Sequence, residues 1–130
     1  MQTSMTRILL VDDDESFRPM IASALERFGF DVVSAVNGRE ALKLFQEQRP
    51  DLVITDLIMP EKEGLETIRD LRLLAPDVRI IAMSGGGRNN PVCYLRIASQ
   101  LGADQILPKP FSFQELLDAI EATIGTDLAK

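Results

Sequence analysis

Five polar side chains directly or closely follow short apolar runs of the sequence. They are Asp12, Asp13, Asp56, Ser84 and Lys109. Carboxylates about 4 Å apart repel each other by on the order of 4 kcal/mol at an effective dielectric constant near 20. If the three aspartates meet in the fold, they therefore need a compensating cation. Mg²⁺ prefers hard oxygen ligands completed by water and phosphate, and Lys109 would supply a further positive charge.

Asp56 differs from the other two acids because it lies inside the otherwise apolar run 52–60. Burying a carboxylate there is unfavourable unless it is paired. A carboxylate beside a metal ion and an ammonium group can attack a phosphoryl group and form an aspartyl phosphate. Ser84 could then donate a hydrogen bond to one phosphoryl oxygen while Lys109 pairs with another. The aspartyl phosphate would carry a local charge of about −2.

Most of these residues, taken singly, also have a structural interpretation. Acids after a strand often cap the next helix, and the run Asp12–Glu15 could do so. Lys109, which lies between two prolines, could be a solvated turn residue, and Ser84 could belong to a turn with Gly85–Gly87. Those glycines lack the Gly-Lys-Ser/Thr ending of a nucleotide-binding loop. Only the combination with Asp56 favours a phosphoryl-transfer site.

The elements that position these residues alternate regularly along the chain. Continuous apolar runs predict strands at 8–11, 31–35, 52–55, 79–83 and 105–107. Such runs are typical of a parallel sheet that is covered on both faces. Apolar residues at helical spacing predict helices at 17–28, 41–45, 65–74, 95–101 and between Ser112 and Gly125. Gly29 is expected to end the first helix, whose apolar stripe includes Met20 and Phe28.

This alternation of about five β-α units predicts a doubly wound α/β fold of the flavodoxin-like type. The expected sheet is parallel and five-stranded, with strand order 2-1-3-4-5. Ligands of such sheets bind at the carboxyl ends of the strands, where the five polar residues fall. We expect a flexible N-terminus at 1–6, one domain at 7–126 and a tail at 127–130.

Composition excludes several classes of function. The 130 residues, 45% hydrophobic and 26% charged, suit one globular domain, and the net charge of −6 opposes binding to nucleic acid or anionic membranes. The chain has no histidine and one cysteine, Cys93, which removes histidine-based triads, the usual zinc sites and an internal disulfide. The apolar run after Arg7 is too short for a signal peptide or membrane span, so we expect a cytoplasmic protein.

The sequence resembles the receiver domain of two-component response regulators over nearly its whole length, and most closely the stand-alone, chemotaxis type. The matching motifs are Val11-Asp12-Asp13-Asp14, Asp56-Leu57-Ile58-Met59-Pro60 with Gly64, Ser84-Gly85, Gly102-Ala103 and Lys109-Pro110-Phe111. The resemblance implies that Asp56 is the phospho-acceptor and that Asp12 and Asp13 hold Mg²⁺ with it. The carbonyl of Ile58 would be a further metal ligand. Ser84 would be the switch hydroxyl, Lys109 would pair with phosphate, and the Lys109–Pro110 bond would be cis.

The resemblance also implies partners: a histidine kinase or phosphotransfer protein as donor, and a downstream protein that binds the face of the fourth helix, fifth strand and fifth helix. Two positions depart from the family pattern. Ile106 replaces an aromatic residue that swings inward, and Ile58 replaces a polar side chain. Two alternatives are a phosphohydrolase with an aspartyl nucleophile and a scaffold that is never phosphorylated. The first would need an acid where Ile58 stands, and the second would normally have lost part of the acidic set.

Overall fold

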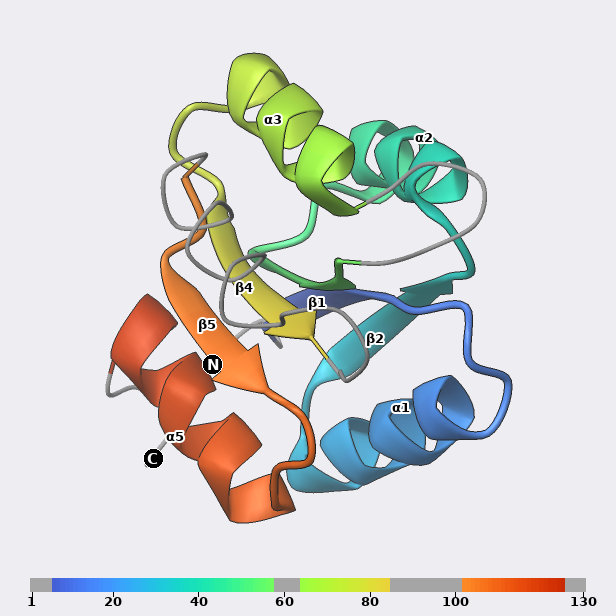
Figure 1. Cartoon of the computed structure of the whole chain (residues 1–130), viewed down its shortest axis with the longest axis vertical. Coiled ribbons are helices and arrows are strands. Elements are labelled where there is room, and N and C mark those ends of the chain that lie inside the picture. Colours follow the sequence, from blue (N-terminus) through green and yellow to red (C-terminus); the bar gives the residue numbers. More distant parts are fainter. Residues whose placement is uncertain (1–5, 58–63, 85–101, 126–130) are drawn as a thin grey trace, which may run out of the picture.

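The computed structural model describes residues 6–57, 64–84 and 102–125. They form one parallel sheet of five strands in the order β2-β1-β3-β4-β5, which confirms the predicted order (Figure 1). The strands are β1 (Arg7–Val11), β2 (Asp31–Ala35), β3 (Leu52–Asp56), β4 (Arg79–Ser84) and β5 (Gln105–Pro108). The last three end one residue later than predicted, because Asp56 still pairs with Met83 and Ser84 with Pro108.

The described helices are α1 (Phe17–Phe28), α2 (Gly38–Gln48), α3 (Gly64–Leu74) and α5 (Phe113–Ile124). Gly29 ends α1 with a left-handed φ of 113°, as its position predicted. Ser112 begins α5 with a capping box that pairs it with Glu115. The fourth predicted helix, at 95–101, lies outside the described residues. None of the helices described is long and apolar enough to cross a membrane.

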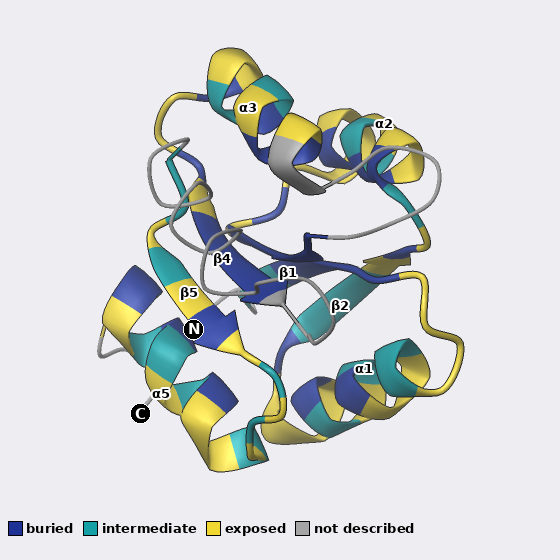
Figure 2. Cartoon of the chain, in the orientation of Figure 1, coloured by how far each residue is buried: buried dark blue, intermediate teal, exposed yellow. Residues whose placement is uncertain are grey.

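Helices cover both faces of the sheet, α1 and α5 on one side and α2 and α3 on the other (Figures 1 and 2). Alternate residues of β1 therefore enter different cores. Leu9 packs with residues of α2 and α3, whereas Leu10 packs with residues of α1 and α5. Both side chains are almost fully buried. Burial on both faces is the physical reason why the strands read as continuous apolar runs.

The predicted apolar stripe of α1 is wrong at two positions. Met20 is 59% exposed and Phe28 is 49% exposed. The row that packs on the sheet contains Ile21 and Leu25, with Phe17 packed against the same core. Compared with the prediction, α1 is rotated about its own axis, so Ile21 and Leu25 face the sheet and the row with Met20 and Phe28 lies at the margin of the buried face. Phe28 still stacks on Phe30, with ring centroids 5.8 Å apart.

Arg7 ties strands together at the amino edge, the edge of the sheet where the strands begin. Its Nε donates to Asp31 Oδ2 at 2.8 Å, and its Nη1 donates to the carbonyl oxygen of Gln48 at 2.6 Å. Its backbone N–H donates to Asp51 Oδ2 at 2.9 Å. This one residue thus contacts the start of β2, the end of α2 and the turn before β3.

Arg72, in the last turn of α3, has a similar role on the other half of the amino edge. Its guanidinium donates to the backbone carbonyls of Pro76, Val78 and Gly102. Its Nη2 lies 3.4 Å from Asp104 Oδ2, which also accepts a hydrogen bond from the N–H of Ile80 at 2.8 Å. A Cβ added at Gly102, where φ is +117°, would come within 2.9 Å of Arg72 Nε. The turn before β5 therefore requires glycine.

Candidate functional site

Three aspartates meet at the carboxyl edge, the edge of the sheet where the strands end. Oxygen atoms of Asp12, Asp13 and Asp56 all lie within 4.8 Å of one another. Asp12 follows β1 and is 1% exposed, while Asp56 ends β3 and is 7% exposed. Asp13 faces solvent. The parallel β1–β3 pairing brings these strand ends side by side, because Val11 lies opposite Thr55 in the register.

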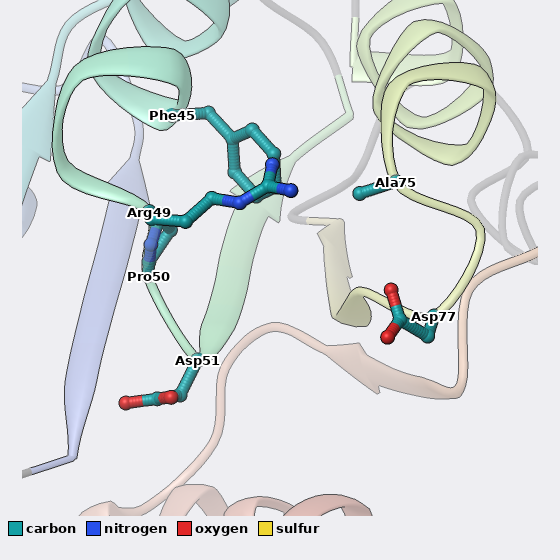
Figure 3. Close-up of a pocket in the computed structure, with 6 residues that line it drawn as sticks. All are labelled: Phe45, Arg49, Pro50, Asp51, Ala75 and Asp77. Atoms are coloured by element: carbon teal, nitrogen blue, oxygen red, sulfur yellow. The ribbon is translucent and has the colours of Figure 1, made fainter.

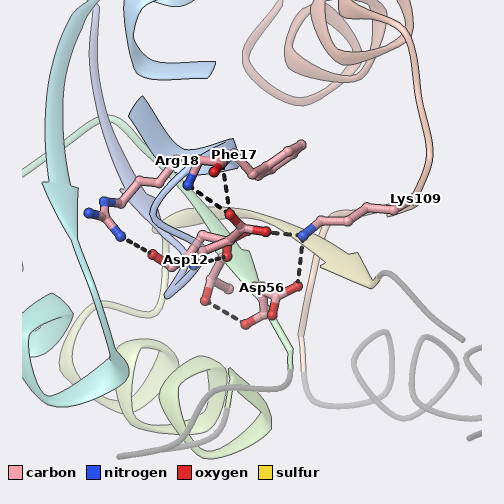
Figure 4. A network of polar contacts seen from close by, with 8 residues as sticks. Asp12, Phe17, Arg18, Asp56 and Lys109 are labelled. Carbon is pink, nitrogen blue, oxygen red and sulfur yellow. Dashed lines mark hydrogen bonds and ion pairs between the residues drawn. The ribbon is translucent and has the colours of Figure 1, made fainter. Parts of the chain in front are cut away.

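Lys109 reaches this cluster from the segment after β5. Its Nζ lies 3.0 Å from Asp12 Oδ2 and 3.4 Å from Asp56 Oδ1 (Figure 4). Burial alone would lower the pKa of Lys109, but the charges of Asp56 and Asp12 outweigh it, and the pKa is raised above its ordinary value of 10.5. The side chain is therefore an ammonium ion at neutral pH. The Lys109–Pro110 peptide bond is cis, as the resemblance implied.

Local hydrogen bonds fix the loop that carries Asp12. Asp12 Oδ1 accepts from the N–H of Asp14 at 2.9 Å, and the carbonyl oxygen of Asp12 accepts from Arg18 Nη1 at 2.8 Å. Arg18 also pairs with Glu15 at 2.8 Å. Arg18 was not among the predicted site residues. Its position near the start of α1, six residues after Asp12, was the signal available.

Asp14 caps the first turn of α1, so the capping interpretation is correct for this acid. Its Oδ1 accepts from the backbone N–H groups of Ser16 at 2.8 Å and Phe17 at 2.9 Å. These two donors, with that of Phe17 the stronger influence, lower the pKa of Asp14 below 3.8. Asp14 thus sets where α1 begins, while Asp12, two residues earlier, belongs to the acidic cluster.

Two of the predicted site residues are described only in part or not at all. Ser84 is the last residue of β4, and its backbone pairs with Pro108 at the same edge as Asp56. The placement of its side chain is not described, and Ile58 lies outside the described residues. Ile106 of β5, the residue that replaces the family's aromatic side chain, is 41% exposed.

The acidic cluster has the donor set that a hard divalent cation requires. Each of the three aspartates offers one carboxylate oxygen, and two of these carboxylates are buried beside an ammonium group. Mg²⁺ favours one or two carboxylates with remaining positions filled by carbonyl, water or phosphate oxygens. The residues present therefore fit Mg²⁺.

A separate pocket of about 280 Å³ lies at the opposite edge of the sheet (Figure 3). It is lined by Phe45, Arg49, Pro50, Asp51, Ala75 and Asp77. Arg49 lies over the ring of Phe45, 5.0 Å from its centroid. Asp51 directly precedes β3, so this pocket is distant from the acidic cluster, which follows the other end of the same strand.

The fold and the acidic cluster define a flavodoxin-like α/β protein whose charged site lies at the carboxyl edge of its sheet. Residues 8–121 match the model of the response regulator receiver domain, and the chain belongs to this family. The receiver domains of two-component systems are thus its relatives. This confirms the resemblance that its motifs indicated.

Individual relatives agree with this assignment. Chemotaxis protein CheY of Bacillus subtilis is 38% identical over 120 residues, which cover 92% of this chain and 98% of that protein. Response regulator MprA of Mycolicibacterium vanbaalenii is 39% identical, and the match covers 91% of this chain. The chain spans about half the length of that relative, 50%.

Solved structures show the same fold. Chemotaxis protein CheY4 of Vibrio cholerae has a TM-score of 0.84 at 30% identity, covering 93% of this chain and 100% of that one. A response regulator of Burkholderia pseudomallei, solved with a phosphorylated aspartic acid, a calcium ion and citrate, has a TM-score of 0.80 at 34% identity. That match covers 90% of this chain and 68% of the other.

Proposed function

We propose that this chain accepts a phosphoryl group on Asp56 from a histidine kinase or a histidine phosphotransfer protein, in a reaction that requires Mg²⁺. The observation that carries the proposal is the position of Asp56, a buried carboxylate within 4.8 Å of two further aspartates and paired with Lys109. The structure of the Burkholderia relative, which contains a phosphorylated aspartic acid and a calcium ion, supports it.

In this proposal Asp12, Asp13 and Asp56 hold the metal ion, together with the backbone carbonyl of Ile58. Bound there, Mg²⁺ would offset the negative charge of the carboxylates and of the incoming phosphoryl oxygens. A carboxylate oxygen of Asp56 forms the new bond to phosphorus as the bond from phosphorus to the donor breaks. The Lys109 ammonium, already 3.4 Å from Asp56, pairs with a phosphoryl oxygen of the product.

The product then acts as a signal through its charge. Phosphorylation replaces the carboxylate of Asp56 with a group of charge about −2 beside β4 and β5, and it gives Ser84 a phosphoryl oxygen to donate to. We infer that this changes the affinity of a downstream protein for the face formed by the fourth helix, β5 and α5. The chain works in the cytoplasm in this proposal, and neither a nucleic acid nor a membrane is among its partners.

The proposed role is signalling and not turnover of a substrate. A phosphohydrolase with an aspartyl nucleophile would use an acid two residues further on, where this sequence has Ile58. A scaffold that is never phosphorylated has no need for the mutually repelling Asp12, Asp13 and Asp56. Both alternatives are therefore weaker than a phospho-acceptor.

Intact-mass analysis with acetyl phosphate and Mg²⁺ tests the proposal. The wild-type chain should gain the mass of one phosphoryl group, and the gain should disappear without Mg²⁺ or in Asp56→Asn. Asp31→Asn is a matched control, since Asp31 pairs with Arg7 at the opposite edge of the sheet and should leave the gain intact. An equal gain in Asp56→Asn would show that another residue is the acceptor.

A further inference from the structure

Phe17, the first residue of α1, contacts the acidic site although it has no polar side-chain atom. The ammonium nitrogen of Lys109 lies 4.2 Å from the centroid of the Phe17 ring (Figure 4). Phe111 packs against Phe17 edge to face, with centroids 5.9 Å apart and planes at 83°. From the sequence, Phe17 is expected only to belong to the apolar stripe of α1, where any large apolar residue would serve.

The distance is that of a cation–π contact. An ammonium group within about 6 Å of an aromatic ring centroid is attracted by the negative face of the ring, and the attraction grows when water is excluded. The Lys109 side chain is only 20% exposed. A leucine at position 17 would fill similar space but has no such face. Phe17 therefore offers Lys109 an interaction that an aliphatic residue cannot replace.

The contact closes a ring of interactions around the site. Asp12 Oδ1 accepts from the N–H of Asp14, and Asp14 Oδ1 accepts from the N–H of Phe17. The Phe17 ring contacts Lys109 Nζ, which in turn donates to Asp12 Oδ2. The backbone of Phe17 is thus held by the same loop that carries the acids. Its ring and the carboxylates approach the ammonium group from different elements of the fold.

We propose that Phe17 is a positioning residue that holds the Lys109 ammonium beside Asp56 for phosphoryl transfer. The inference rests on the proposed function of Asp56. The Lys109 ammonium must lie at a defined position to pair with the incoming phosphoryl oxygens. Without the Phe17 ring, only the carboxylates would hold the end of its flexible four-carbon side chain, so its position would be less well defined. We expect Phe17→Leu to slow phosphorylation roughly threefold to tenfold, the range that a partly buried cation–π contact supports.

The first measurement does not depend on phosphorylation. A proton held over a ring face is shifted upfield by the ring current, so the ε-methylene protons of Lys109 report the contact by nuclear magnetic resonance. Without Mg²⁺ or donor, the upfield shift should be present in the wild-type chain and in Phe17→Tyr, which keeps a ring. It should be absent in Phe17→Leu. Phe17→Met provides the same comparison if the leucine variant folds poorly.

The second measurement is the initial rate of phosphorylation by acetyl phosphate at saturating Mg²⁺. Phe17→Leu should be slower than wild type, and Phe17→Tyr should restore the rate. Phe28→Leu is the matched control because it removes an aromatic ring from the other end of α1, where Phe28 stacks on Phe30. Its rate should equal that of wild type.

Several outcomes would overturn the inference: no upfield shift in wild type, equal rates in wild type and Phe17→Leu, or an equal loss in Phe17→Leu and Phe17→Tyr. The last result would mean that Phe17 only fills space in the core. A wild-type chain that accepts no phosphoryl group would instead contradict the proposed function. The resonance measurement would then still decide whether Phe17 holds Lys109.

Discussion

The two edges of the sheet use charged residues in opposite ways. At the amino edge, the guanidinium of Arg7 contacts one backbone carbonyl and a carboxylate, and that of Arg72 contacts several backbone carbonyls and a carboxylate, so opposite charges and polar groups satisfy one another. At the carboxyl edge, Asp12, Asp13 and Asp56 crowd together, and within the described residues Lys109 is the cation that pairs with both buried acids.

The charged residues at the amino edge stabilise the fold, whereas the acids at the carboxyl edge are the ones that a ligand could stabilise. A guanidinium that donates to carbonyls of several elements stabilises their arrangement, because those carbonyls would otherwise lose a donor. Crowded carboxylates repel one another and destabilise the chain by itself. The crowding of Asp12, Asp13 and Asp56 at the carboxyl edge is therefore the feature that favours our proposal of a cation site there.

Lys109→Met should produce the largest change, because it leaves the buried Asp12 and Asp56 without their ammonium partner. Methionine keeps a long side chain at this position but carries no charge. We expect the free energy of unfolding to fall by about 3 kcal/mol in the absence of Mg²⁺. Saturating Mg²⁺ should restore most of the loss by binding to the native carboxylates. Urea unfolding with and without Mg²⁺ measures both effects, and a deficit that Mg²⁺ leaves unchanged would contradict a metal site here.

Arg72→Met should destabilise the chain by about 2 kcal/mol, because several carbonyls and Asp104 lose a donor. Here Mg²⁺ should restore nothing, since the defect lies at the amino edge. Arg69→Met is the matched control on the same helix, with a side chain 56% exposed and a 3.4 Å ion pair to Asp70. It should change stability by less than about 0.5 kcal/mol. An equal fall in the free energy of unfolding for the two variants, measured with urea, would contradict the role of Arg72 in joining α3 to the start of β5.

Removal of one acid should have opposite effects at the two edges. Asp13→Ala relieves repulsion, so the metal-free chain should gain up to about 1 kcal/mol of stability while its affinity for Mg²⁺ falls. Asp104→Ala should lose about 1 kcal/mol, since the N–H of Ile80 and Arg72 lose an acceptor, with the affinity unchanged. Thermal unfolding during a Mg²⁺ titration tests both variants. Unchanged affinity in Asp13→Ala would exclude Asp13 as a ligand.

The smallest effect concerns Asp14, whose lowered pKa gives a predictable dependence on pH. Because its pKa is lower in the folded than in the unfolded chain, its charge stabilises the fold above about pH 4. That contribution is lost as the pH falls through the folded-state pKa. Asp14→Asn should therefore be less stable than wild type at pH 7, and the difference should narrow below pH 4. A difference that stays constant in urea unfolding at pH 7 and pH 3 would contradict a stabilising contribution from the charge of Asp14.

Local sequence patterns were sufficient to predict much of the fold. Apolar runs located all five strands, and helical spacing with Gly29 located both ends of α1. The meeting of Asp12, Asp56 and Lys109 at one edge followed from the alternation of strands and helices, and the flavodoxin-like strand order that we expected for such a sheet is confirmed. These inferences succeed because backbone periodicity and the right-handed β-α-β connection are properties of short segments.

Other features were decided only by the tertiary structure. The rotation of α1, which leaves Met20 and Phe28 exposed, depends on how the helix lies over the sheet. The contact of Phe17 with Lys109 joins the first helix to the segment after the last strand, and Arg72 reaches Gly102 in a similar way. Periodicity assigns a residue to a face of its own element. Which distant side chain meets that face depends on how all the elements pack together.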